Sequence, residues 1–371
     1  MYRNKFAVGG GVYLLNHSVG RPPVTARAIV EERYFEPWMR ADAEPWPDWL
    51  AEIDRFRDAL ASLFGGEKAN FCPQPNLSSA LTKVVNSQPG EQGRDTIVYC
   101  EADFPSMGFV LSMAKKAGYK LRCIPDSAEL GDAGAWSKFL DDGCHMILVT
   151  HVHSNSSRLV PVTGICDIAR QQGVISIIDV AQSAGIVPID LHCWDADFVL
   201  GSCVKFLCGG PGAGFLWVNN RVLQQSEPTD VGWFSHADPL EFDIHDFRYA
   251  DSALRFWGGT PAVLPYVAAA NSIELLDEIG VETTRKHSLG LTQKILDSID
   301  ERAVVTPQSP ESRGGTLVLD FGKHQAVVEE WLAAAGVHFD TRHTGIRLSP
   351  HIYTTEEEIG RVIGCLQAGS V

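Results

Sequence analysis

The sequence lacks the features of membrane, secreted and nucleic-acid-binding proteins. It has no apolar run of about 18 residues, the length that a transmembrane helix needs, so we expect no membrane partner. Its first residues include a short apolar run but no small-residue cleavage site of a signal peptide. Basic residues are few, with 31 Lys and Arg against 46 Asp and Glu, and the resulting net charge of −15 argues against a nucleic-acid partner.

Cysteine and glycine patterns exclude further classes. The nine cysteines are odd in number and scattered, and no CxxC pair occurs, so neither a disulfide framework nor a zinc site is indicated. We expect a reduced, cytoplasmic protein without a bound metal. No GxGxxG follows the first expected strand, which disfavours a Rossmann dehydrogenase.

What the sequence does contain is a regular alternation of short apolar runs with stretches of helical periodicity. The expected strands are 96–100, 120–124, 145–150, 174–179, 196–200 and 214–218, and the expected helices are 48–63, 76–85, 104–117, 164–172 and 261–279. This alternation predicts an α/β fold with a mostly parallel sheet that is covered on both faces.

The C-terminal part changes character and predicts a second, smaller unit. Helices are expected at 283–299, 325–335 and 355–366, and strands at 316–320 and 345–349. We therefore expect an N-terminal segment (1–45) that packs with the small domain, a large domain (46–280) and a small α+β domain (281–371).

Three local features carry chemistry. Asp179 ends the strand VISIID, and ligands of open α/β sheets bind at the carboxyl ends of parallel strands, although Asp is also a common helix cap. Lys205, in GSCVKFLCGGPG, lies between a strand and a glycine-rich turn. Such an apolar setting lowers the pKa of an amine and suits it to Schiff-base chemistry, the alternative being a surface lysine. In FCPQPNLSSALTKVV a polar turn opens a helix, whose free N–H groups near Asn76 could receive a phosphate.

Together these features resemble the fold-type I PLP-dependent enzymes of the class V aminotransferase family. HVHSNSSRLVPV, IIDVAQSAGIVPIDL and DADFVLGSCVKFLCGGPGAGFLWV follow one another in the family's order and spacing. VGWFSHADPLEFD and RFWGGTP are similar to the kynureninase branch, and IRLSPHIYTTEEEI is similar to the family's substrate-carboxylate strand. The resemblance implies a large domain with a mostly parallel seven-stranded sheet, a small C-terminal domain, and pyridoxal 5'-phosphate (PLP) as the cofactor.

The resemblance also implies how PLP is held. Lys205 would bind it as an internal aldimine and shuttle protons. Asp179 would pair with the pyridine nitrogen, so that the ring can draw electrons from the substrate. Gln182 would reach the phenolic oxygen, and Phe104 would stack on the ring. The residues implied for the phosphate are Asn76, Leu77 and Ser202.

Further implied residues concern the substrate and a partner subunit. Trp233 and Thr260 would come from the neighbouring subunit, because the family builds its sites across a homodimer interface. Arg347 would clamp the α-carboxylate of an amino-acid substrate in bidentate fashion. Asn16 and His17 would lie at the substrate entrance, although a structural role for this histidine is an equal alternative.

The reaction is less determined than the cofactor. No cysteine closely precedes Arg347, which disfavours a cysteine desulfurase. Val204, Met107 and Gln182 replace the Tyr, Asp and His that kynureninases have, which opposes hydrolytic cleavage. We expect an enzyme that acts on an amino acid through an external aldimine, by transamination or by lyase chemistry at the β position. A true kynureninase, which cleaves Cβ–Cγ hydrolytically, and a non-catalytic PLP-fold binding protein are the alternatives.

Overall fold

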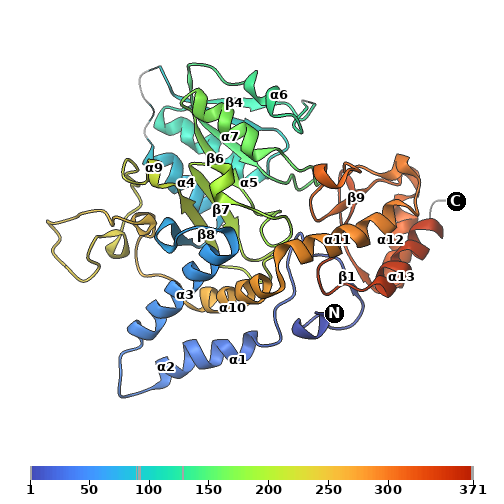
Figure 1. Cartoon of the computed structure of the whole chain (residues 1–371), viewed down its shortest axis with the longest axis horizontal. Coiled ribbons are helices and arrows are strands. Elements are labelled where there is room, and N and C mark those ends of the chain that lie inside the picture. The colour runs from blue at the N-terminus through green and yellow to red at the C-terminus, as the bar shows by residue number, and fades with distance from the viewer. Residues whose placement is uncertain (1, 89, 91–92, 128, 369–371) are drawn as a thin grey trace.

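A seven-stranded sheet forms the centre of the larger part of the molecule (Figure 1). The computed structural model describes residues 2–88, 90, 93–127 and 129–368. In spatial order the strands are β2 (Phe71–Gln74), β8 (Gly214–Val218), β7 (Phe198–Ser202), β6 (Ile175–Asp179), β5 (Cys144–Thr150), β3 (Thr96–Cys100) and β4 (Lys120–Ile124). The strands from β7 to β4 are parallel to their neighbours, whereas β8 runs antiparallel to both β7 and β2. The expected mostly parallel seven-stranded sheet is confirmed.

Helices cover both faces of this sheet, because side chains of the central strands alternate between two apolar clusters. On β5, Ile147 and Val149 join one cluster, while Met146 and Leu148 join the other. The first cluster includes α3 (Trp46–Phe64), α7 (Val162–Gln171) and α10 (Leu264–Ile279), and the second includes α4 (Leu77–Ser87) and α5 (Pro105–Ala114). Every central strand is therefore buried on two sides, which explains its continuous apolar sequence.

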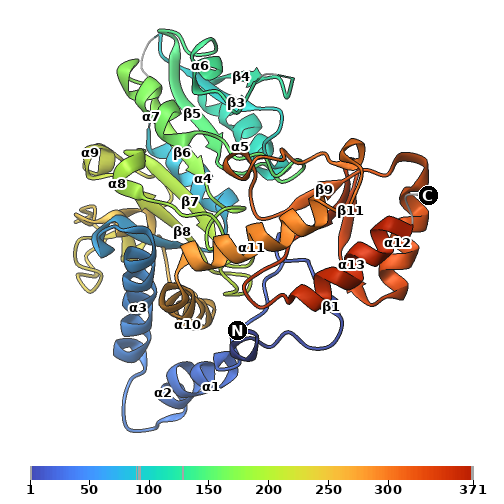
Figure 2. The same ribbon diagram turned by 45° about the vertical axis from the view of Figure 1, so that its right-hand side comes forward.

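A smaller unit packs beside the large sheet (Figure 2). Its antiparallel sheet has the order β11 (Asp340–Arg342), β12 (Gly345–Leu348), β9 (Leu317–Leu319), and its own apolar core includes residues of α11 (Val281–Leu296), α12 (Gln325–Ala334) and α13 (Glu356–Ala368). The N-terminal β1 (Val12–Tyr13) pairs in parallel with β10 (Val337–His338). The domain boundary expected at residue 280 stays a prediction; Gly280 lies there, between α10 and α11.

The N-terminal segment contains helices that the sequence patterns did not predict: α1 (Ala26–Val30), a π-helical turn (Glu31–Phe35) and α2 (Glu36–Met39). Other additions are the short helices α6 (Ala133–Ser137), α8 (Leu191–Trp194) and α9 (Asn220–Leu223). In the described part of the chain, no helix combines the length and apolar character needed to cross a membrane. The same residues contain no group of three or more His, Cys, Asp or Glu that could hold a metal ion.

Candidate active site

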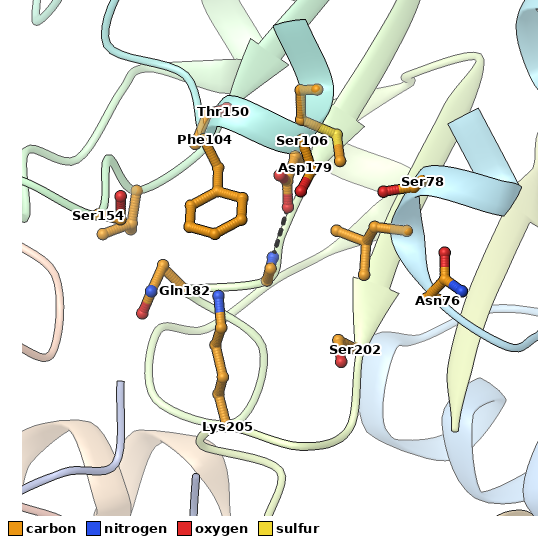
Figure 3. A pocket seen from close by; sticks show the side chains of 14 residues that line it. Asn76, Ser78, Phe104, Ser106, Thr150, Ser154, Asp179, Gln182, Ser202 and Lys205 are labelled. Carbon is orange, nitrogen blue, oxygen red and sulfur yellow. Dashed lines mark hydrogen bonds between the residues drawn. The ribbon is translucent and has the colours of Figure 1, made fainter. Parts of the chain in front are cut away.

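A pocket opens at the carboxyl ends of three neighbouring parallel strands (Figure 3). Thr150 ends β5, Asp179 ends β6 and Ser202 ends β7, and all three line the pocket. The other lining residues come from the loops and helices that follow these strands and from the start of α4 and α5: Asn76, Leu77, Ser78, Phe104, Ser106, Met107, Val152, Ser154, Ala181, Gln182 and Lys205. The fold therefore brings together fourteen residues that lie up to 129 positions apart in the sequence, among them the predicted Asp179 and Lys205.

Seven of these fourteen are predicted cofactor-site residues, and Thr150 is among the other seven. The seven are Asn76, Leu77, Phe104, Asp179, Gln182, Ser202 and Lys205, the first and the last marking the extremes in sequence.

Lys205 directs its amine into the pocket from the loop after β7 (Figure 3). Its Nζ lies 5.6 Å from the centroid of the Phe104 ring and forms no hydrogen bond or ion pair with a described residue. Burial lowers the pKa of this amine to about 8; the nearby Asp179 opposes the shift, and the positive charges of Arg342 and Arg347 add to it. The site therefore holds a lysine that is far more often neutral than an ordinary one, as a nucleophilic amine must be.

Asp179 presents a buried carboxylate to the same pocket. Its Oδ1 accepts a hydrogen bond from the backbone N–H of Ala181 at 2.8 Å, and its Oδ2 accepts none from a described residue. Burial raises the pKa of the carboxyl, whereas the Ala181 N–H and the charge of Lys205 lower it. An oxygen with free acceptor capacity is thus available for a cationic N–H group.

Gln182 faces the pocket from the turn that follows Asp179. Its Nε2 donates to the backbone carbonyl of His17 at 3.1 Å, while its Oε1 is buried without a hydrogen-bond partner. The amide can turn so that either its oxygen or its nitrogen points into the pocket. Its unpaired end therefore suits a polar atom of a bound group, whether that atom donates or accepts.

The start of α4 forms one corner of the pocket, and its geometry suits an anion. Asn76 caps this 11-residue helix, because its side chain accepts from the N–H of Ser79 at 2.9 Å. The N–H groups of Leu77 and Ser78 point out of the first turn without a partner inside the helix. Together with the Ser202 side chain they suit a phosphate group.

Phe104 stands at the start of α5, and a buried carboxylate fixes the turn before it. Asp103 accepts hydrogen bonds at 2.7 Å from both the Thr150 hydroxyl and the Cys100 N–H, and burial raises the pKa of its carboxyl to about 7. Asp103 and Thr150 are not among the residues predicted from the sequence. Their only signal was position, since each lies next to a strand end.

The predicted substrate residue Arg347 is engaged by a carboxylate of the chain itself. Its side chain is 2% exposed, its Nε donates to Asp340 Oδ1 at 2.8 Å, and its Nη2 donates to Asp340 Oδ2. Asp340 is the residue opposite Arg347 in the β11–β12 pairing. The pKa of this carboxyl is held well below its usual range by His17 and Arg347, against the effect of burial.

His17 and Asn16 are buried near the Arg347–Asp340 pair but do not line the pocket. His17 contacts Asp340 through Nε2 at 2.8 Å and Ser349 through Nδ1 at 2.5 Å, and burial lowers its pKa. Asn16 donates to the Ser349 carbonyl at 2.7 Å and accepts from the Tyr353 hydroxyl. The geometry gives both side chains structural partners, and their substrate contact stays a prediction.

Trp233 and Thr260 lie away from the pocket of their own chain. Trp233 packs against Phe234, with ring centroids 4.3 Å apart, and against Trp46 at 6.0 Å. Thr260 is exposed. A contact with the pocket of a second copy stays a prediction for both.

The N-terminal segment closes over the Lys205 loop. The N–H of Gly20 donates to the carbonyl of Val204 at 2.8 Å. A Cβ atom at Gly20 would lie 2.1 Å from the Lys205 carbonyl oxygen and 2.6 Å from Cys208 Sγ. Only glycine allows this approach, which holds the loop in place.

The residues present fit the expected PLP. A partnerless amine, a buried carboxylate with a free oxygen and an unpaired amide oxygen face one cavity, and the phosphate corner at α4 opens into it. A phenyl ring stands beside the amine. These are the donors and acceptors that the aldehyde, the ring nitrogen, the ring hydroxyl and the phosphate of PLP require.

Comparisons with known proteins agree with this assignment. A family profile described as "Aminotransferase class-V" matches residues 55–362. The uncharacterized aminotransferase YcbU of Bacillus subtilis (strain 168) is 27% identical over 329 residues, which cover 88% of this chain and 86% of the relative. The kynureninase of Pseudomonas fluorescens is 26% identical over 378 residues, covering 96% of this chain and 89% of the relative.

Among solved structures, the fold matches that of the cystine C–S lyase C-DES. A variant of that protein, with glycine covalently linked to its PLP cofactor, superposes with a TM-score of 0.88 at 21% identity, covering 98% of each chain. This likeness confirms the expected fold-type I architecture.

Proposed function

Because the chain belongs to the class V aminotransferase family, a family of PLP-dependent enzymes, we propose that it binds PLP through Lys205 and acts on an amino acid by transamination or by lyase chemistry at the β carbon. The observation that carries the proposal is the partnerless Lys205 amine in a pocket that also contains the buried Asp179 carboxylate. The names of the matched relatives, an aminotransferase and a kynureninase, support the same range of reactions.

The chain's own groups would divide the work. PLP, when bound, supplies an electron sink for the electron pair left at the substrate Cα. Lys205 Nζ would hold the cofactor and move the proton at Cα, for which a pKa near working pH is favourable. Asp179 would keep the ring nitrogen protonated, and Phe104 would orient the ring.

Two observations bear on the alternative reactions. Met107 and Gln182 line the pocket where kynureninases would have Asp and His, which weakens the case for hydrolytic Cβ–Cγ cleavage. None of the residues that line the pocket is a cysteine, and Cys365 lies on α13 against Trp331. We therefore do not propose a cysteine desulfurase, which needs a thiolate nucleophile at the substrate.

We further propose that the protein acts as a homodimer, with Trp233 and Thr260 reaching the pocket of the second copy. The loop after Trp233 supports this, because it exposes Leu240, Phe242 and Ile244 at 69%, 73% and 90%. Mixing Lys205→Ala with Trp233→Ala protein tests it. Hybrid dimers should regain one intact site and part of the activity, whereas independent monomers would regain none.

A reduced, cytoplasmic location is part of the proposal. All nine cysteines are described, and all nine are free thiols in the structure. Thiol titration of the denatured protein, purified without reductant, should find nine free thiols. A reproducible loss of two thiols that reductant restores would contradict this location.

The reaction is tested by incubating the PLP-loaded protein with amino acids one at a time. Conversion of the bound cofactor to its pyridoxamine form indicates transamination, and release of pyruvate without that conversion indicates β-lyase chemistry. Release of alanine from kynurenine indicates the kynureninase alternative. If no amino acid changes the cofactor spectrum, the protein is a binding protein and the proposed function is wrong.

A further inference from the structure

Two arginine side chains of the β11–β12 hairpin lie against one residue of the pocket wall. Arg347 Nη1 donates to the backbone carbonyl of Ser154 at 3.3 Å, and Arg342 Nη1 lies 3.4 Å from the hydroxyl of the same serine. Arg342 Nη1 also donates to Asn155 Oδ1 at 3.0 Å. Since Ser154 lines the pocket, both guanidinium groups are brought to its edge.

The two guanidinium groups differ in what binds them. Arg347 is paired with Asp340, as described above. Arg342 is only partly buried, forms no ion pair within the described chain, and donates to no described residue from Nε or Nη2. Arg342 is not itself a lining residue, but it lies against Ser154 and Phe104, which are. An arginine beside a pocket with free donors is able to bind an anion.

Asp340 leaves one edge of Arg347 available. It occupies the Nε and Nη2 side of the guanidinium and is itself held by His17. The end of the guanidinium, between Nη1 and Nη2, retains donors beyond the single 3.3 Å contact with Ser154. Asp340 thus fixes the orientation of Arg347 without covering all of its donors.

Arg342 and Arg347 lie close to the amine that would bind the cofactor, since both of their charges act on Lys205. The Cζ of Arg342 is 5.7 Å from the centroid of the Phe104 ring, and Lys205 Nζ is 5.6 Å from the same centroid. A carboxylate bound here would belong to a molecule whose amine lies near the lysine, which is the geometry of an α-amino acid.

The charges of Arg342, Arg347 and Asp340 together match one carboxylate. Arg342 and Arg347 contribute two positive charges, and Asp340 contributes one negative charge, so a single positive charge is uncompensated. A carboxylate bound between the arginines neutralises it, whereas a second carboxylate on the substrate would find no described cationic partner left at this corner.

We propose that Arg342 and Arg347 together bind the α-carboxylate of the substrate, that Asp340 is a positioning residue for Arg347, and that the site prefers amino acids with a single carboxylate. This inference rests on the proposed function, and it names Arg342 as a specificity residue that the sequence did not reveal.

The test is a spectral titration of the PLP-loaded protein with two amino acids of nearly equal shape, L-asparagine and L-aspartate, and with ethylamine, which lacks a carboxylate. The wild type should bind asparagine roughly tenfold more tightly than aspartate. Arg342→Gln should weaken asparagine binding by about 10- to 100-fold and leave ethylamine binding within about twofold of wild type, because a charge-assisted hydrogen bond is lost only where a carboxylate is present. Arg302→Gln, at an 86% exposed side chain, is the matched control.

Two results would overturn the inference while the proposed function stands. One is unchanged asparagine binding in Arg342→Gln. The other is a loss confined to aspartate, which would mean that Arg342 binds a side-chain carboxylate. Absence of any cofactor spectrum in the wild type would instead remove the proposed function and the inference together.

A second measurement does not depend on the cofactor. Phenylglyoxal should modify Arg342 of the PLP-free protein, as located by mass spectrometry, well before the buried and Asp340-paired Arg347. Equal rates at the two arginines would contradict the difference on which the inference depends.

The positioning role of Asp340 is tested in the PLP-loaded enzyme. Asp340→Asn should raise the KM for asparagine severalfold with little change in kcat. A kcat that falls by the same factor as KM rises would assign Asp340 a merely structural role.

Discussion

The amine of Lys205 lies 5.6 Å from the ring centroid of Phe104, and no carboxylate of the described residues forms an ion pair with it. The two residues come from different strand ends, Lys205 from the loop after β7 and Phe104 from the start of α5, which follows β3. A free amine beside a phenyl ring in a buried pocket leaves room for a planar group next to both side chains.

Lys205→Ala should abolish covalent attachment of PLP. Wild-type protein loaded with PLP should show a visible absorbance band that borohydride removes, with the reduced cofactor fixed to the peptide that contains Lys205. The variant should retain no borohydride-fixed cofactor. Lys120→Ala is the control, because that side chain is 72% exposed and, among the residues that the structure describes, pairs only with Asp95. Fixation at another lysine of the wild type would refute the assignment.

The rate of PLP attachment should rise with pH and level off above about pH 9. The neutral amine attacks, and with the pKa of Lys205 lowered to about 8 by burial, about a tenth of the amines are neutral at pH 7. Stopped-flow absorbance of PLP mixed with the PLP-free protein gives this profile. An attachment rate that keeps rising beyond pH 10 would indicate an ordinary lysine instead.

Asp179→Asn should separate binding from chemistry. An amide cannot keep the ring nitrogen protonated, so we expect kcat to fall by at least about 100-fold while PLP still attaches. Because the charge of Asp179 raises the pKa of Lys205, the attachment profile of the variant should move to lower pH. A profile that stays in place or moves upward would show that the two groups do not interact.

Gly20→Ala should disturb the Lys205 loop from a distance in sequence. The added Cβ would lie 2.1 Å from the Lys205 carbonyl oxygen, so the N-terminal segment or the Lys205 loop must shift, at a cost of about 1–3 kcal/mol. We expect a lower melting temperature and at least about tenfold weaker PLP binding. Gly10→Ala is the matched control, since no atom of the described part of the chain lies within 4 Å of its added Cβ. Equal behaviour of the two variants would exclude the proposed constraint.

Most of the large sheet was predictable because its strands are buried on both faces. Runs such as those of β3, β5 and β8 are continuously apolar, and the structure confirms them. The exception is β2, which we had assigned to a turn. It has only four residues and contains Pro73, and proline is tolerated in an edge strand, which is where β2 lies.

The candidate site was predictable where its residues lie in local motifs and obscure where they meet through tertiary structure. Asp179 and Lys205 each belong to a short, informative segment. Asp340 and Arg342 sit in a charged stretch typical of a solvated hairpin, and only the pairing of β11 with β12 shows that Asp340 faces Arg347. Spacing along the chain carries no information on that cross-strand contact.

The position of Ser154 between the two sheets has a mechanical consequence. It follows β5 of the large sheet, yet it accepts the contacts of two arginines from the hairpin of the small sheet, so this residue is a joint between the two units. A carboxylate bound by both arginines would strengthen this connection, since it would add hydrogen bonds to guanidinium donors that are otherwise free. Ligand occupancy should therefore slow amide hydrogen exchange in β11 and β12, which are more than 130 positions from the lysine in the sequence and belong to the other unit.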